Sequence, residues 1–402
     1  MNKTIPEVRF KGFTDDWEQR KLGDITESFS GGTPTAGKSE YYGGDIPFIR
    51  SGEISSELTE LFITENGLNN SSAKMVKVGD ILYALYGATS GEVSISRING
   101  AINQAILAIR PTKNDNSYLI VQWLRKQKDT IISTYLQGGQ GNLSSSIVKD
   151  LVITLPQDKE EQSKIGAFFK QLDDTIALHQ RQLENYQKLK KAMLQEIFPE
   201  KGSEIPKIRF GGFTEKWEQR KLGEEFVFFS GLTYSPSNIR ESGSLVLRSS
   251  NVQNGEIVDA DNVYVENSVV NSKNVEVGDI AVVVRNGSRS LIGKHAQIKK
   301  EMPNTVIGAF MTGITYKVPK FANALLGTQT FEKEIAKNLG ATINQITTGM
   351  FKQMIFDFPN EKIEQVKIGE FFNTLDNTIA LHQKKAEELK RAKKYFLKKM
   401  FI

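Results

Sequence analysis

The stretch GGTPTAGKS, residues 31–39, has the spacing of a phosphate-binding loop. From Gly32 the pattern G-x-x-x-x-G-K-S is complete, and such a loop holds nucleotide phosphates with its backbone N–H groups and its lysine. The loop needs a buried strand before it and a helix that begins at the Lys-Ser pair. Here the preceding ITESFS is polar, and the following EYYGGDIP contains two glycines and a proline. We therefore interpret the spacing as a coincidence within a loop, and nucleotide binding stays only as an alternative.

Other residue combinations that support catalysis are missing from the sequence. There is no cysteine, and the three histidines, His179, His295 and His382, have no metal-binding spacing. The G-x-S-x-G motif of a nucleophilic serine is absent. So is the Pro-Pro dipeptide that a methyltransferase acting on exocyclic amines would need. We expect a non-catalytic chain with no metal site and no cofactor of its own.

Composition places the chain among ordinary soluble proteins. The 402 residues carry a formal net charge of +5, which is compatible with a polyanionic partner but does not identify one. No apolar run approaches the roughly 20 residues that cross a bilayer, and MNKTIPEVRF lacks the apolar core of a secretory signal. We expect a cytoplasmic protein that makes no contact with membranes.

Two segments of the chain are repeated almost unchanged. Residues 8–23, VRFKGFTDDWEQRKLG, match residues 208–223 at 12 of 16 positions. Residues 164–180 match residues 367–383, KIGEFFNTLDNTIALHQ, at 13 of 17 positions. Between these constant segments the halves share only short motifs such as VGDI. We interpret the chain as a tandem duplication in which the constant segments contact a common partner or each other, and the variable regions recognise two different targets.

Each closing segment has the apolar spacing of a coiled-coil helix. Apolar residues recur at alternating steps of four and three from Ile165, and again from Ile368. A histidine occupies the same place in both series, where a polar side chain fixes register and partner. We expect the two helices to pair antiparallel, related by a pseudo-twofold axis, and to set the distance between two globular domains. The predicted seam residues are Ile165, Phe169, Leu172, Ile176, His179, Leu183, Ile368, Phe372, Leu375, Ile379, His382 and Leu389.

The variable regions mix short β-rich runs with helical stretches. VGDI followed by apolar residues, at 78–87 and 277–288, predicts a turn into a buried strand. The amphipathic stretches 116–136 and 321–338 each predict a helix. The fold class is therefore α+β, with two tandem α/β domains and two long helices.

Polar, glycine-rich stretches follow the predicted strands at 86–92, 138–146, 284–295 and 340–349. Asn, Gln, Ser, Thr, Arg and Lys are the side chains that bind base edges and phosphates. For any single residue, a place in a solvated loop is the simpler interpretation. For the whole set, the duplication and the constant spacing favour binding to double-stranded DNA. The candidate contacts are Lys38, Arg50, Tyr86, Thr89, Ser90, Gln140, Asn142, Ser144, Arg248, Arg285, Asn286, Arg289, Lys294, Asn344 and Gln345.

The chain resembles the specificity (S) subunit, HsdS, of type I restriction-modification enzymes. The W-E-x-x-x-L-G opening at 17–23 and 217–223 carries the resemblance, together with SGGTP at 30–34 and YGGDIPFIRSGEI at 42–54. So does KIGxFFxxLDxTIALHQ, which is present in each predicted helix. The resemblance covers essentially the whole chain, in the family's order of target recognition domain, helix, target recognition domain and helix.

The resemblance implies a protein that binds a bipartite, asymmetric DNA site, one half per target recognition domain, with a spacer set by the helices. It implies two modification subunits that dock around the constant helices and bring S-adenosylmethionine for adenine methylation. It also implies two restriction subunits that add ATP- and Mg-dependent translocation and cleavage, and no catalysis in this chain. The second domain has SGLTY where the first has SGGTP, so no shared contact is expected there.

The repeat boundaries divide the chain into four parts. Residues 1–156 and 201–359 are the two predicted target recognition domains, and 157–200 and 360–402 are the two coiled-coil helices. A coiled-coil scaffold that only dimerises is the other alternative, besides the nucleotide-binding protein.

Overall fold

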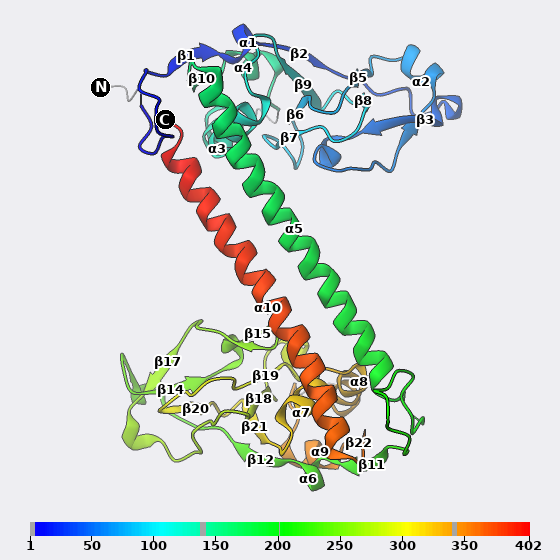
Figure 1. Ribbon diagram of the computed structural model, residues 1–402, viewed down its shortest axis with the longest axis vertical. Coiled ribbons are helices and arrows are strands. Elements are labelled where there is room, and N and C mark those ends of the chain that lie inside the picture. The colour runs from blue at the N-terminus through cyan, green and yellow to red at the C-terminus, as the bar shows by residue number, and fades with distance from the viewer. Residues whose placement is uncertain (1–4, 137–141, 201, 340–343) are drawn as a thin grey trace. The chain divides into compact units, whose positions relative to one another are not determined.

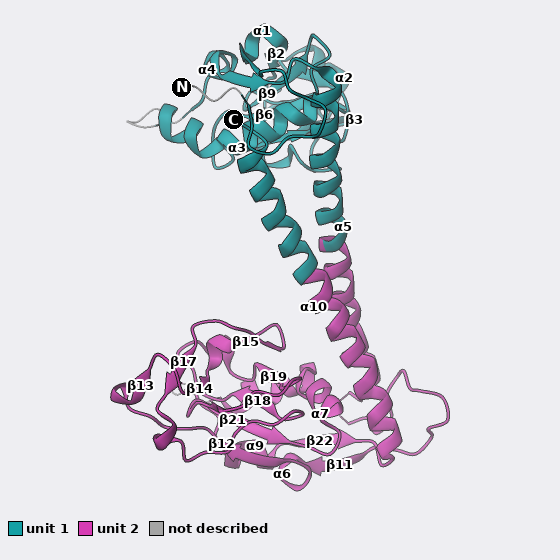
Figure 2. Cartoon of the chain, turned by 60° about the vertical axis from the view of Figure 1, so that its left-hand side comes forward, with its two compact units in different colours: residues 1–179, 384–402 teal, residues 180–383 magenta. Residues whose placement is uncertain are grey.

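The computed structural model describes residues 5–136, 142–200, 202–339 and 344–402. The chain divides into two compact units (Figure 2), of which the first joins residues 1–179 to 384–402 and the second is residues 180–383. Each unit therefore holds one variable region, the first part of one long helix and the last part of the other. None of the helices in the described ranges is both long and apolar enough to span a bilayer.

The first unit contains two four-stranded sheets and a two-stranded ribbon. One sheet is antiparallel with the order β2-β9-β6-β7, and the other has the order β4-β3-β8-β5 with β3 and β8 parallel. The ribbon pairs β1 with β10. The bounds are β1 (Glu18–Lys21), α1 (Leu22–Ile25), β2 (Thr26–Ser30), β3 (Tyr42–Ile49), β4 (Phe62–Ile63), α2 (Glu65–Asn69), β5 (Lys74–Val76), β6 (Ile81–Ala84), β7 (Val93–Ile95), β8 (Gly100–Ile102), β9 (Ile106–Pro111), α3 (Ser117–Tyr135), α4 (Ser145–Asp150) and β10 (Val152–Leu155).

The second unit repeats this plan. Its sheets have the orders β12-β21-β18-β19 and β13-β17-β14-β20, and β11 pairs with β22. A small extra ribbon joins β15 to β16. The bounds are β11 (Glu218–Lys221), α6 (Leu222–Glu225), β12 (Val227–Ser230), β13 (Ile239–Arg240), β14 (Ser244–Leu247), β15 (Val252–Gln253), β16 (Glu256–Ile257), β17 (Val263–Val265), β18 (Ile280–Val283), β19 (His295–Gln297), β20 (Thr305–Ile307), β21 (Met311–Thr315), α7 (Pro319–Leu326), α8 (Gln329–Asn338), α9 (Thr348–Gln353) and β22 (Ile355–Phe358).

The VGDI motifs lead into strands that are buried on both faces, as predicted. In β6, Ile81 and Tyr83 pack into the core that contains α3, whereas Leu82 and Ala84 pack into the core between the two sheets. Strand β18 divides its side chains between two cores in the same way. Because neither face meets water, these strands are continuous apolar runs rather than alternating ones.

One predicted helix is two helices in the structure. The stretch 321–338 is wrong as a single helix, because α7 ends at Leu326 and α8 begins at Gln329. Thr328 Oγ1 accepts a hydrogen bond from Phe331 N at 3.2 Å and so caps a new helix start. The predicted helix 116–136 is confirmed as α3.

The two long helices, α5 (Lys159–Ile197) and α10 (Lys362–Lys399), pair antiparallel. In the first unit Phe168 of α5 packs on Phe396, and Asp173, further along α5, binds Lys393, which lies earlier in α10. The order is the same in the second unit, where Tyr186 stacks on His382 and the later Lys190 binds the earlier Asp376 (Figure 1 labels both helices). The predicted antiparallel pairing is confirmed.

Burial follows the predicted seam. The seam residues that are buried are Ile165, Phe169, Ile176, Ile368, Phe372, Leu375 and Ile379. Those that are partly buried are Leu172, His179, Leu183, His382 and Leu389. All of the buried predicted seam residues lie in the first half of their helix.

Each constant opening is fixed to the start of the helix in its own half. Arg9 binds Glu161 through two hydrogen bonds of 2.6 and 2.8 Å, and Arg209 binds Glu364 at 2.7 and 2.8 Å. Both glutamates are buried. A lysine of each helix also lies over the phenylalanine of each GFT motif, at 4.9 and 4.8 Å from the ring centroid. The identity of the constant segments is thus explained in part by contacts that they make with each other.

The tryptophan of each opening packs against the end of the helix from the other half. In the first unit Trp17 meets Phe401 edge-on, with ring centroids 6.4 Å apart. In the second unit Trp217 meets Phe198 edge-on at 5.9 Å. Phe198 and Phe401 are equivalent residues of the repeat, so the two halves exchange their helix ends.

Asp173 is a partly buried carboxylate that accepts hydrogen bonds from several donors. Tyr118 donates at 2.6 Å, Gln122 at 3.1 Å and Arg125 at 2.9 Å, and Lys393 forms an ion pair at 2.5 Å. Burial alone would raise the pKa of Asp173, but the hydrogen bonds and charges of its partners outweigh burial and lower it. The carboxylate is therefore ionised where it joins α3, α5 and α10.

We expect Asp173→Asn to destabilise the first unit by about 3 kcal/mol, because the three hydrogen-bond donors and Lys393 all lose a partly buried carboxylate. Since the folded pKa is lowered, this contribution is present above the ordinary pKa of an aspartate and is lost as the pH falls through the lowered value. Hydrogen-exchange mass spectrometry of peptides from α3 measures it. The matched control is Asp376→Asn, whose carboxylate binds the equivalent Lys190 in the second unit, and its effect is measured on peptides from α7 of that unit. A loss from Asp376→Asn as large as that from Asp173→Asn would contradict a role for the additional donors.

Candidate nucleic-acid interface

In the first unit, two of the predicted loops meet at the end of the central strand. Strand β6 continues to Tyr86, which forms an antiparallel bridge with Asn142. Leu143 N donates to Leu85 O at 2.8 Å, and both of these leucines are buried. The buried leucines fix the bridge, so that Tyr86 and Asn142 lie side by side beyond the end of β6.

Two of the other candidates from these two loops, Ser90 and Ser144, make hydrogen bonds within the loops. Ser90 Oγ donates to Leu85 O at 3.0 Å and is buried, and Ser144 Oγ caps α4 by accepting from Ile147 N at 3.2 Å. The buried Oγ1 of Thr89 has no hydrogen-bond partner within the described part of the chain. Gln140 lies outside the described residues.

The second unit brings its two loops together by the same construction. Strand β18 continues to Arg285, which forms an antiparallel bridge with Gln345. Ile346 N donates to Val284 O at 2.9 Å, and Ile346 and Val284 are both buried. The pair Arg285 and Gln345 therefore occupies the place that Tyr86 and Asn142 hold in the first unit.

Arg285 lies over an exposed aromatic ring. Its guanidinium carbon is 4.9 Å from the ring centroid of Phe310, whose side chain is 53% exposed. Phe310 borders a hollow of about 600 Å³ that is also lined by Arg248 and Ser249. Asn286 donates to Ser249 at 3.0 Å and so links the loop to this hollow.

The remaining candidates of the second unit are more dispersed. Asn344 donates to Gly287 O at 3.1 Å and joins the two loops. Arg289 makes 3.4 Å bonds to carbonyl oxygens at the end of α8, and with Lys294 it lines a different hollow of about 720 Å³. Arg289 and Lys294 are thus not beside Phe310.

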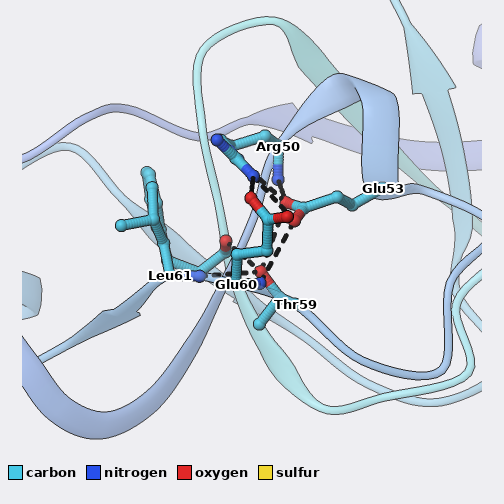
Figure 3. Close-up of polar contacts among 6 residues, drawn as sticks. Arg50, Glu53, Thr59, Glu60 and Leu61 are labelled. Carbon is cyan, nitrogen blue, oxygen red and sulfur yellow. Dashed lines mark hydrogen bonds and ion pairs between the residues drawn. The ribbon is translucent and has the colours of Figure 1, made fainter.

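Arg50 is held by two carboxylates instead of being open to a ligand (Figure 3). It binds Glu53 at 2.9 and 3.1 Å and Glu60 at 2.7 Å. Glu53 also accepts from Thr59 Oγ1 and from the backbone N–H groups of Arg50 and Glu60. The hydrogen bonds from Arg50 lower the pKa of Glu53 to about 2. This cluster ties the turn after β3 to the segment that leads into β4.

Arg248 has the equivalent role in the second unit. Its guanidinium binds the carboxylate of Asp261 at 2.5 Å and the Asp261 backbone oxygen at 2.6 Å. Asn251, fully buried, accepts from Arg248 N and donates to the oxygens of Ala260 and Asn262. Both arginines of the repeated RS motif thus bind within their own domains.

The GGTPTAGKS stretch lacks the surroundings of a phosphate-binding loop. Strand β2 before it is an edge strand, and Ser39–Tyr41 form a single short 3₁₀ turn that leads directly into β3. Lys38 donates to Tyr41 Oη at 3.0 Å and lies over the same ring. A Cβ on Gly31 would lie 1.8 Å from Ile102 O, so this glycine is needed for backbone packing.

Sequence reasoning missed Phe310. An aromatic residue in the run IGAFMTGITY is most simply predicted to be core, and the neighbouring Met311 is indeed buried. The available signal was its place directly before the strand β21, whose residues from Met311 to Ile314 are continuously buried.

The comparisons with known proteins agree with the duplicated plan. The family of type I restriction modification DNA specificity domains matches the chain twice, over residues 14–187 and 214–391. The described residues contain no group of three or more His, Cys, Asp or Glu placed to hold a metal ion.

Individual relatives match over nearly the whole chain. The type I restriction enzyme MjaVIII specificity subunit of Methanocaldococcus jannaschii is 24% identical, over 94% of this chain and 91% of that protein. The putative MjaX specificity subunit of the same organism is also 24% identical, with the same coverage. The solved S subunit of a type-I restriction-modification system from M. genitalium has a TM-score of 0.72 at 17% identity and covers 99% of both chains, so the fold is shared.

We expect Glu53→Gln to destabilise the first unit at neutral pH, because Arg50 keeps only the exposed Glu60. The folded pKa of Glu53 lies near 2, below its ordinary 4.5, so its contribution is present above pH 4.5 and is lost as the pH falls towards 2. The difference in thermal stability between wild type and variant should therefore shrink on acidification. Glu57→Gln, which removes the exposed partner of Arg97, is the control and should show no such trend. A difference that is constant with pH would contradict the prediction.

Proposed function

Because the chain belongs to the family of type I restriction modification DNA specificity domains, we propose that it is the subunit that gives a type I restriction-modification complex its DNA sequence specificity. Each of its two domains recognises one half of a bipartite, asymmetric site on double-stranded DNA in the cytoplasm. One observation carries the proposal: the same strand-to-loop bridge is built twice, with Tyr86 and Asn142 in one domain and Arg285 and Gln345 in the other. Because the backbone arrangement is the same but the side chains differ, the two domains are suited to bind two different half-sites.

We propose that the long helices set the spacer between the half-sites and dock two modification subunits. Leu178 and Leu381 are equivalent residues of the repeat and are 51% and 64% exposed. Their identity is not needed for packing inside the chain, but it is expected if two copies of one partner bind two equal surfaces. Two restriction subunits complete the assembly.

In this proposal the chain performs no catalysis. S-adenosylmethionine, ATP and Mg²⁺ bind to the partner subunits. The chain supplies sequence-dependent contacts from its loops and salt-dependent contacts from its basic side chains.

We expect replacement of residues 24–155 by the corresponding region of another family member to change one half-site and leave the other half-site and the spacer unchanged. The reason is that the bridge of the first domain lies wholly within this region. Methylome sequencing of cells that carry the chimaera with the modification subunit measures the motif. An unchanged motif, or two changed half-sites, would sink the assignment of one half-site to each domain.

We expect a seven-residue insertion after Glu184 and after Glu387 to lengthen the spacer by about three base pairs. Seven residues add about 10 Å of helix and keep the apolar seam in register, whereas each base pair adds about 3.4 Å. The two half-sites should stay the same, and the same sequencing measures both. The control replaces seven residues of each helix at the same place without changing its length. Altered half-sites with an unaltered spacer would disprove the role of the helices.

A further inference from the structure

Arg285 differs from Arg248 and Arg240, two other arginines of its domain, in having no carboxylate partner among the described residues. Its side chain is exposed, and no carboxylate lies within ion-pair distance of it in the described residues. By contrast, Arg248 is paired with Asp261, and Arg240 with Glu266 at 2.7 Å. The contact of Arg285 is the ring of Phe310, which covers one face of the guanidinium and leaves its N–H edge open.

The backbone holds Arg285 in a fixed position. Arg285 N and Val284 N both donate to Phe310 O, at 3.1 and 3.0 Å, so that the arginine and its platform are joined directly. The buried Val284 and Ile346 lock the strand on the other side. A long side chain that is stacked and anchored in this way loses little further conformational entropy when it binds.

We propose that Arg285 binds the major-groove edge of a guanine in the half-site that the second domain recognises. An arginine edge donates two parallel hydrogen bonds to guanine O6 and N7, which is the commonest specific contact between side chains and bases. This inference rests on the proposed function, since it requires that the second domain binds DNA.

Gln345 extends the contact to a neighbouring base pair. In an antiparallel bridge the paired Cα atoms lie about 5 Å apart, which corresponds to between one and two base-pair steps of about 3.4 Å. Glutamine binds adenine through N6 and N7, so the pair Arg285 and Gln345 favours a guanine next to an adenine or within one step of it.

The first domain has different side chains at the positions equivalent to Arg285 and Phe310. Tyr86 replaces Arg285, and Ala105, whose oxygen accepts from Leu85 N at 2.8 Å, replaces Phe310. Tyr86 is partly buried against the core, and burial raises its pKa. The described pair Tyr86 and Asn142 contains no cation to bind guanine in the same way, and Asn142 is suited to bind adenine.

The test uses the complex of the full chain with its modification subunit and duplexes that carry its methylated motif. Each guanine of the second half-site is replaced in turn by 7-deazaguanine, which pairs normally but lacks the N7 acceptor. At one position we expect the wild-type complex to lose about tenfold in affinity, the loss of one hydrogen bond to a charged group. In the Arg285→Ala complex the same replacement should change nothing.

Two further variants separate this contact from general charge effects. Arg240→Ala removes an equal charge from the same domain and should keep the full sensitivity to 7-deazaguanine. Phe310→Leu keeps Arg285 but removes its aromatic platform, and should reduce the sensitivity to 7-deazaguanine.

Sensitivity that persists in Arg285→Ala overturns the inference. A second half-site in which replacing guanine N7 never changes the affinity overturns it as well. If Arg285→Ala weakens binding to all sequences equally, the contact is to a phosphate and the inference also fails. Only a wild-type complex with no sequence preference would overturn the proposed function instead.

Discussion

The molecule depends on one contact that is made twice. A phenylalanine at the end of each long helix packs on a tryptophan of the other half. Phe401 lies on Trp17, and Phe198 lies on Trp217, each within a core that also holds the start of a helix. Neither half of the duplicated chain contains all the side chains of one core. The antiparallel direction of α5 and α10 is therefore a requirement of core packing, in addition to the seam between the helices.

This exchange explains where the chain tolerates change. The openings and helix starts are nearly identical in both halves because each must fit the same neighbours, as Arg9 fits Glu161 and Arg209 fits Glu364. The sheets between them are fixed to this frame by the ribbons β1–β10 and β11–β22. Between the constant segments the two halves share only short motifs, and this divergence is what recognition of two different half-sites needs.

The sequence predicts those features that depend on local patterns. The helices follow from apolar spacing, and the buried strands from continuous apolar runs. The break before Thr328 does have a local signal, Gly327 followed by a capping threonine, which the amphipathic spacing of the stretch outweighed. Two other features depend on contacts between distant residues and are not predictable from a local pattern. The bridge of Tyr86 with Asn142 joins residues far apart in the sequence. From the sequence Arg50 is a candidate to bind DNA, whereas in the structure its guanidinium binds Glu60.

The division of the chain into units also sets an order of completion during synthesis. The second unit is one continuous run, residues 180–383, whereas the first unit combines residues 1–179 with 384–402. The ribosome therefore finishes every residue of the second unit before the first unit can close its core around Phe401. Until then Trp17 lacks its partner, and the first domain, although synthesised first, is the last to become fully stable.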